Sequence, residues 1–333
     1  LFRSVIDNSK HLNSVIAFDK QAATVEVQPG VVLDQLNAWL KPHGLWFPVD
    51  VSTSAQATLG GMAGNNSCGS RSIAYGNMVH NVLGIDAILA DGTQDFFGPF
   101  GAGARRPLSS GRTGSLVARL HEIAARERDE IERVWPQVMR RVGGYNLDVF
   151  HPRSERPYTP DGSVNLAHLL VGSEGTLAYF RRLHLKLSPL PRAKVLGVVN
   201  FPSFHAAMQS AQHIVKLGPT AVELVDRTMI DLSRANPVFR PTIDAALIGE
   251  PDAVLLVEFA GDDRQLLLGK LRELTELMAD LGLPGVVVEM PDEKPQKELW
   301  EVRKAGLNIM MSLRGDGKPV SFVSDALQQM GGG

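Results

Sequence analysis

The sequence predicts an α+β chain in two domains, and three observations support this. A chain of 333 residues, 44% of them hydrophobic, can bury more core than one typical domain holds. Short apolar runs typical of strands dominate up to about Gly111, whereas strands and helices alternate after Lys194. The cluster Pro189–Pro191 separates these patterns, so we expect domains at residues 1–191 and 192–323, with 324–333 an unassigned tail.

The first domain is predicted to contain short strands, two helical stretches and an irregular segment. Apolar alternation and flanking turn residues indicate strands at Val25–Gln28, Val82–Leu89, Leu169–Gly172 and Phe180–Leu187. Helical spacing of apolar residues predicts helices over residues 33–40 and Thr113–Val142, the second one continuous or broken near Pro136. The prolines of Tyr145–Asn165 indicate an irregular segment.

The second domain shows a regular alternation that predicts its topology. The expected elements, in order, are strand Val195–Phe201, helix Ser203–Leu217, strand Thr220–Val225, a helix near Thr228–Arg234, strand Ala253–Phe259, helix Asp262–Leu281 and strand Val286–Met290. Apart from the short central helix, this is the order β-α-β-β-α-β of a ferredoxin-like domain. A long helix, Pro295–Leu313, is expected after it.

Composition and motifs exclude several classes of protein. The net charge of −2 gives no electrostatic footprint for nucleic acid, and no apolar run approaches the ~20 residues that span a bilayer. A single cysteine excludes an internal disulfide, fits a reducing compartment and favours a cytoplasmic protein. Gly101-Ala-Gly103 lacks the third glycine of a dinucleotide fingerprint, and there is no Walker A loop.

The stretch Thr58–Gly76 is the first candidate site. Its glycines at 60, 61, 64 and 69 allow close approach of a ligand and positive φ where needed, and its amides and hydroxyls add short donors. Free N–H groups in such a loop would suit a pyrophosphate; a compact structural loop is the alternative. Cys68 is interpreted as a packing residue, because a catalytic thiolate needs a nearby cation or histidine.

The segment Leu170–Ala178 is the second candidate site. Glu174 lies between two glycines there, which favours a role in holding a turn over that of a solvated carboxylate. The nine histidines show neither H-x-x-x-H nor H-E-x-x-H spacing, so no metal site is predicted from this sequence.

Seven motifs occur in one order along the chain: Val27–Gly30, Ala57–Gly61, Tyr75-Gly76, Asn81–Gly84, Leu89–Thr93, Gly143–Leu147 and Gly172–Leu177. In these motifs the chain resembles the FAD-linked oxidases of the vanillyl-alcohol-oxidase/PCMH superfamily, most of all the D-lactate and D-2-hydroxyglutarate dehydrogenase branch. The resemblance implies a PCMH-type FAD-binding domain followed by a ferredoxin-like cap domain that binds the substrate.

The resemblance also implies the ligands. FAD would be bound by Pro48, Thr58, Gly60, Gly61, Asn66, Ser67, Gly69, Ser70, Gly76, Val82, Glu174, Gly175 and Leu177. The substrate, a small D-2-hydroxy acid, would pass a hydride to flavin N5 while Arg303 and Lys318 hold its carboxylate. A solvated pair of cations near a helix end is the alternative for these two residues.

Relatives imply parts that this sequence does not match. They have a Gly-rich subdomain before the region where it begins, and after Lys318 a catalytic histidine, often with a divalent metal and in some members an iron–sulfur domain. No catalytic base is therefore expected within residues 1–333. Electrons would leave to an iron–sulfur partner or a quinone pool, which fits a cytoplasmic protein peripheral to the inner membrane. The alternatives are an FAD-dependent alcohol or aldonolactone oxidase using O2 and a non-catalytic flavin-binding module.

Overall fold

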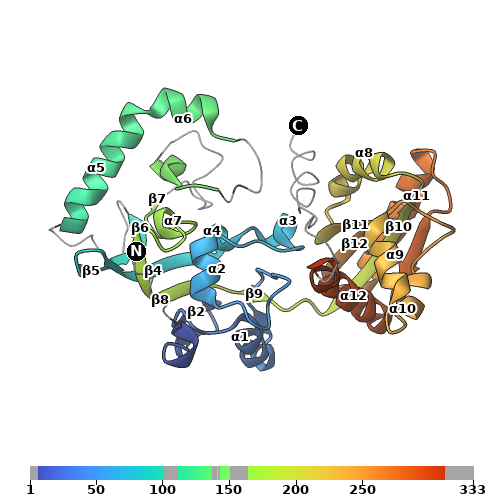
Figure 1. Cartoon of the computed structure of the whole chain (residues 1–333), viewed down its shortest axis with the longest axis horizontal. Coiled ribbons are helices and arrows are strands. Elements are labelled where there is room, and N and C mark those ends of the chain that lie inside the picture. The colour runs from blue at the N-terminus through green and yellow to red at the C-terminus, as the bar shows by residue number, and fades with distance from the viewer. Residues whose placement is uncertain (1–6, 101–111, 137–140, 142, 151–163, 312–333) are drawn as a thin grey trace. The chain divides into compact units, whose positions relative to one another are not determined.

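The computed structural model describes residues 7–100, 112–136, 141, 143–150 and 164–311. The chain forms two compact units, Leu1–Leu190 (unit 1) and Pro191–Gly333 (unit 2), shown in Figure 1. Both mix helices and sheet, and the antiparallel sheets confirm the predicted α+β class.

Unit 1 is built on a five-stranded antiparallel sheet in the order β1–β2–β8–β4–β5. These strands span Val15–Asp19, Thr24–Val27, Ala178–Lys186, Val82–Leu89 and Gln94–Phe97. Strand β8 lies between β2 and β4, where Leu183 pairs with Val27 on one side and Ile85 on the other. All three side chains are fully buried, so β8, the last strand of this sheet in sequence, forms the centre of the core.

Short elements surround this sheet. The helices of unit 1 are α1 (Leu33–Leu40), α2 (Leu59–Asn65), α3 (Ser72–Tyr75), α4 (Met78–Asn81), α5 (Arg112–Arg126), α6 (Arg128–Val134) and α7 (Ala167–Leu170). Single 3₁₀ turns are η1 (Asn8–Lys10), η2 (Lys41–His43) and η3 (Leu147–Phe150). Two-residue strands pair as β3 (Leu45–Trp46) with β9 (Ser188–Pro189), and β6 (Pro99–Phe100) with β7 (Val164–Asn165).

Two expectations for unit 1 are wrong in part. The apolar run Leu169–Gly172 is not a strand but the end of helix α7 and a turn; a short run buried on all sides has no period that separates helix from strand. The long charged helix does end before Pro136, with Trp135 extended. It is also interrupted at Glu127 (φ −91°, ψ 15°), which its sequence did not indicate. Residues 137–140 and 142 lie outside the described residues.

Unit 2 has the predicted ferredoxin-like topology. Its sheet runs β11–β12–β10–β13 with antiparallel neighbours throughout, from Ala221–Asp226, Ala253–Gly261, Ala193–Phe201 and Val287–Met290. The first and third strands are therefore central, as in a split β-α-β unit. The helices are α8 (Phe204–Ile214), η4 (Val215–Leu217), α9 (Arg227–Ala235), α10 (Arg240–Asp244), α11 (Arg264–Asp280) and α12 (Glu293–Met311).

The sheet of unit 2 is buried on both faces. Along β12, Leu255 and Val257 pack with α8 and α11, whereas Val254 and Leu256 pack with α9, α10 and α12. Figure 1 shows the sheet between these two sets of helices. Two-sided burial explains why β12 is a continuous apolar run rather than an alternating one.

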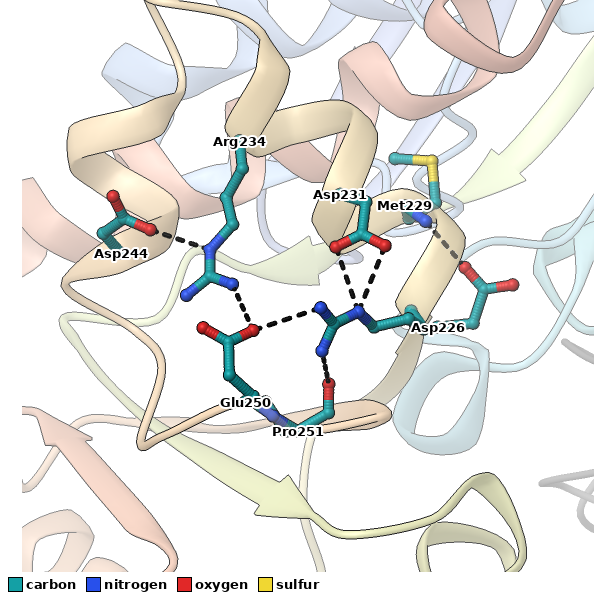
Figure 2. Close-up of polar contacts among 8 residues, drawn as sticks. Asp226, Met229, Asp231, Arg234, Asp244, Glu250 and Pro251 are labelled. Carbon is teal, nitrogen blue, oxygen red and sulfur yellow. Dashed lines mark hydrogen bonds and ion pairs between the residues drawn. The ribbon is translucent and has the colours of Figure 1, made fainter.

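An ion-pair network holds the α9–α10 connection of unit 2 (Figure 2). Glu250 contacts Arg234 at 2.7 Å and Arg227 at 3.1 Å. Arg234 also reaches Asp244 at 2.9 Å, and Arg227 reaches Asp231 at 3.0 Å. The hydrogen bond from Arg234 lowers the pKa of Glu250. Glu250 thus joins α9 to the loop before β12, and the Arg234–Asp244 pair joins α9 to α10.

We expect Glu250→Gln to lower the midpoint of thermal unfolding slightly in low salt, because both arginines lose a charged partner. The difference from the parent protein should shrink as salt is added. Since the folded pKa of Glu250 is lowered, its contribution exists at neutral pH and should disappear as the pH falls through that pKa. Glu276→Gln, on an exposed part of α11, is the control; equal effects of the two variants would contradict this role.

Candidate functional site

The glycine-rich stretch begins as a helix, not as the predicted loop. Thr58 is extended (φ −85°, ψ 145°) and its Oγ1 accepts the Gly61 N–H at 3.4 Å, so it caps α2. Leu59, Met62 and Ala63 are buried, and this packing offsets the low helix propensity of three glycines.

The glycines there serve close packing rather than positive φ. None of Gly60, Gly61, Gly64 and Gly69 has positive φ, which corrects that expectation. A Cβ on Gly60 would lie 2.5 Å from the Pro29 Cβ. A Cβ on Gly69 would lie 2.2 Å from the Asp50 carbonyl oxygen. These two glycines are therefore required by the protein's own backbone.

The first N–H groups of α2 are already bonded within the protein. The Leu59 N–H donates to the Val31 carbonyl at 2.9 Å, and the Gly60 N–H donates to the Pro29 carbonyl at 2.8 Å. The expectation of free donors along Thr58–Gly76 therefore does not hold for Leu59 and Gly60. These residues are fixed against the Val27–Gly30 motif instead.

The carboxyl end of α2 is closed by Asn66. This residue is left-handed (φ 50°), its N–H donates to Ala63 and the Ser67 N–H donates to Met62, which is a Schellman cap. Its side chain is buried: Oδ1 accepts the Val79 N–H at 3.0 Å, and Nδ2 donates to the Arg141 carbonyl at 3.3 Å. Asn66 thus connects α2 to α4 and to the segment before Gly143.

The second candidate segment completes the same cap. The Gly172 N–H donates to the Ala63 carbonyl and the Glu174 N–H donates to the Gly64 carbonyl, each at 2.9 Å. Glu174 has φ 51° between positive-φ neighbours Gly172 and Gly175, and its side chain is exposed. It therefore holds the turn through its backbone, and the two predicted segments lie side by side.

A buried polar network supports this arrangement. Arg141 and Asp148 form an ion pair at 2.7 Å with side chains 6% and 1% exposed. Asn146 accepts from Arg141 at 3.2 Å and donates to the carbonyls of His168 and Val171 at 2.8 and 3.0 Å. The predicted motif Gly143–Leu147 contains Asn146, but Arg141 and Asp148 were not predicted. A polar residue two positions after Gly144 was the available signal for Asn146.

The remaining predicted cofactor residues lie around the same helices. Ser67 Oγ accepts from Asn65 Nδ2 at 3.0 Å, and Gly76 has positive φ (73°) and ends α3. Pro48 and Val82 are buried. The Val82 carbonyl lies 3.3 Å from His168 Nε2, and burial lowers the pKa of His168 to about 3, so this imidazole is neutral at physiological pH.

Several donors around the two candidate segments have no hydrogen-bond partner among the described residues. Among the described residues, no acceptor faces the backbone N–H groups of Ser70, Gly175 and Leu177. Within the same set, Ser173 Oγ and Asn77 Nδ2 are buried without a hydrogen-bond partner. The Leu177 and Tyr145 side chains are 37% and 51% exposed. Donors beside apolar and aromatic surface fit a ligand that combines anionic or carbonyl oxygens with a flat ring, as FAD does.

Gly64 marks a space beside these donors. A Cβ built on Gly64 would meet, among the described residues, only the Gly175 backbone nitrogen, at 3.9 Å. Gly60 and Gly69 are packed tightly by comparison. Although Gly64 is buried, a methyl group at this position would therefore make no close contact with any described residue.

The predicted substrate cations belong to unit 2. Arg303 on α12 donates through Nε and Nη2 to Glu223 Oε2 of β11, at 3.1 and 2.7 Å. Lys318 lies outside the described residues, so its place stays a prediction. Glu223 was missed, although a carboxylate between the inward-facing Ala221 and Val225 of an apolar strand was a usable signal.

Neither a metal-binding cluster nor a membrane-spanning helix is found among the described residues. In the part of the chain that the structure describes, no three His, Cys, Asp or Glu side chains group closely enough to hold a metal ion. No helix among those residues has the length and apolar character needed to cross a membrane.

Comparison with known families identifies both units. Residues 3–95 match the family described as the FAD binding domain, and residues 190–327 match the C-terminal domain of FAD linked oxidases. Among solved structures, an alkyldihydroxyacetonephosphate synthase superposes with a TM-score of 0.58 at 17% identity, covering 90% of this chain and 48% of that one. This last likeness concerns the fold alone.

Curated relatives are dehydrogenases of hydroxy acids. D-2-hydroxyglutarate dehydrogenases of Pantoea ananatis and Escherichia coli are 31% and 30% identical over 96% of this chain. A probable mitochondrial D-lactate dehydrogenase of Danio rerio is 26% identical over 92% of it and is covered over 49% of its own length. The chain spans about a third, 32%, of the length of the two bacterial relatives.

The network predicts a large effect of one buried charge. Asp148→Asn should lower the free energy of unfolding by about 3 kcal/mol, because it removes a charged partner from the buried Arg141 guanidinium. Urea unfolding measures this, with Asp129→Asn on the exposed face of α6 as the control. A loss no greater than that of the control would contradict a supporting role for the Arg141–Asp148 pair.

Proposed function

Because the chain belongs to the FAD-linked oxidases, we propose that it binds cofactor and substrate in an FAD-dependent dehydrogenase of a small D-2-hydroxy acid. The observation that carries this proposal is the identity of 30–31% to D-2-hydroxyglutarate dehydrogenases over 96% of the chain. D-2-hydroxyglutarate and D-lactate are the substrates that the relatives' names suggest.

Unit 1 is proposed to hold FAD at the junction of α2 and the Gly172–Leu177 turn. The unused N–H groups of Ser70, Gly175 and Leu177 would donate to the cofactor, and the space beside Gly64 would admit it. When bound, FAD supplies a two-electron acceptor for the hydride on the substrate α-carbon. The capped end of α2 holds these donors in place before the ligand arrives, which reduces the entropy lost on binding.

Unit 2 is proposed to recognise the substrate carboxylate. Arg303 presents a planar guanidinium that matches a carboxylate, and Lys318 would add a second positive charge. The base that takes the hydroxyl proton is proposed to belong to a part of the protein outside residues 1–333. As acceptor we propose an iron–sulfur domain or a quinone pool, which would bring a cytoplasmic protein to the inner membrane.

The test of this function uses the full-length protein with its flavin. Under anaerobic conditions, D-2-hydroxyglutarate or D-lactate should bleach the flavin absorbance and their L enantiomers should not. Arg303→Ala should raise KM for the acid roughly 10- to 100-fold, as expected for loss of a charge-assisted contact. Lys304→Ala changes a neighbouring surface cation and should leave KM unchanged.

Three outcomes would contradict the proposal. A protein that takes up no FAD would remove the cofactor. A flavin reduced only by neutral alcohols, without effect of Arg303→Ala, would favour an alcohol or aldonolactone oxidase. A bound flavin that no alcohol or acid reduces would favour a non-catalytic flavin-binding module.

Gly64→Ala tests the place of FAD without relying on activity. The substitution removes an unfavourable helical glycine and meets only the Gly175 nitrogen at 3.9 Å, so stability should not fall. The added methyl would occupy the proposed cofactor space, and the FAD dissociation constant should rise by roughly tenfold or more. Flavin fluorescence titration measures it.

Gly269→Ala is the matched control for this experiment, since it lies within α11 with only the end of Arg272 nearby, at 3.8 Å. It should leave FAD affinity unchanged. Unchanged affinity in Gly64→Ala as well would show that FAD does not approach this junction.

A further inference from the structure

We propose that Glu223 is a positioning residue that fixes Arg303 for one substrate carboxylate. This inference deepens the proposed function and rests on it. Its basis is the ion pair between Glu223 of β11 and Arg303 of α12, which both lie within unit 2.

Glu223 uses only one edge of the guanidinium. An arginine has a side edge, formed by Nε and one Nη, and an end edge, formed by both Nη atoms. Glu223 Oε2 takes the side edge, at 3.1 Å from Nε and 2.7 Å from Nη2. No other described residue forms a hydrogen bond or ion pair with Arg303. The end edge, with Nη1, is therefore available for a second carboxylate.

The two side chains are unequally buried, so one residue of the ion pair lies further inside the protein than the other. The Glu223 side chain is 11% exposed and that of Arg303 is 32% exposed. Glu223 lies on the sheet face whose neighbours Ala221 and Val225 pack with Leu299 and Trp300 of α12. The carboxylate thus forms the rigid, inner half of the pair, and the guanidinium is the outer half that a ligand can reach.

In this geometry Glu223 fixes the orientation of the Arg303 guanidinium, which is a different effect from the positive charge alone. An arginine free to rotate would attract any anion but would lose side-chain conformational entropy on binding it. Fixed through its side edge, Arg303 can form two parallel hydrogen bonds in one orientation only. Partial neutralisation by Glu223 also weakens non-directional attraction of anions. We expect selectivity for a carboxylate over inorganic anions to depend on Glu223.

The experiment is a double-mutant cycle on the full-length, FAD-loaded protein. Binding of 2-oxoglutarate, the product-like acid, is measured calorimetrically, and KM and kcat are measured with D-2-hydroxyglutarate. Glu223→Ala should weaken 2-oxoglutarate binding and raise KM roughly tenfold or more, as expected for a lost charge-assisted contact. Glu223→Gln, which still accepts from Nε and Nη2, should recover most of this loss.

The cycle distinguishes positioning from a structural role. Because Glu223 acts through Arg303, Glu223→Ala should have no further effect on binding in an Arg303→Ala background. An effect of the same size in both backgrounds, or none in either, would overturn the inference. Glu289→Ala, a strand carboxylate bonded to Thr275 at 3.1 Å, is the control and should bind normally.

Two results separate failure of this inference from failure of the proposed function. If no D-2-hydroxy acid reduces the flavin but 2-oxoglutarate binding still depends on coupled Glu223 and Arg303, the function fails and the positioning role stands. If reduction occurs and the two residues are uncoupled, the reverse holds. Should Glu223→Ala not fold, Glu223→Met, which keeps the side-chain volume but accepts no hydrogen bond from Arg303, supplies the same comparison in the two Arg303 backgrounds, with equal effects overturning the inference.

Discussion

The carbonyl groups at the end of α2 are the constraint on which unit 1 depends. A helix of seven residues with three glycines is not stable alone, and its final carbonyls are buried. Asn66 and Ser67 donate to the Ala63 and Met62 carbonyls, and the backbone of Gly172–Glu174 donates to those of Ala63 and Gly64. The turn must therefore lie against α2, and β8, which follows it, enters the sheet between β2 and β4.

The buried Arg141–Asp148 pair extends the same constraint. Isolated charges are costly in a protein interior, so the pair persists only where hydrogen bonds complete it. Asn146 provides one such bond and also reaches the carbonyls at the end of α7, next to the turn. The cap of α2 is therefore stabilised by Arg141, Asn146 and Asp148, whose side chains hold one another in place through hydrogen bonds. A surface of this kind suits a cofactor that needs donors in fixed positions.

The accuracy of the sequence-based predictions followed the range of the stabilising contacts. Strand β4 and the four strands of unit 2 were predicted because burial periodicity is local to each segment. Helix α2 was missed because glycine, asparagine and serine favour loops, and its stabilising partners in Gly172–Glu174 are distant in sequence. Free donors were expected at Thr58–Gly61 for the same reason: the acceptors Pro29 and Val31 were not predicted to be there.

In unit 2, a partner distant in sequence was likewise missed at a predicted substrate-binding residue. Arg303 was predicted as a cation that holds the substrate carboxylate, but its ion-pair partner Glu223, on a strand far from it in sequence, was not predicted. That carboxylate is buried because β11 needs its other inward residues, Ala221 and Val225, to pack beneath α12. A solvent-exposed partner would have left the guanidinium mobile, and an apolar one would have left it unpaired. The proposed recognition by Arg303 therefore depends on the packing of α12 on the sheet, which buries the Glu223 carboxylate beside the guanidinium.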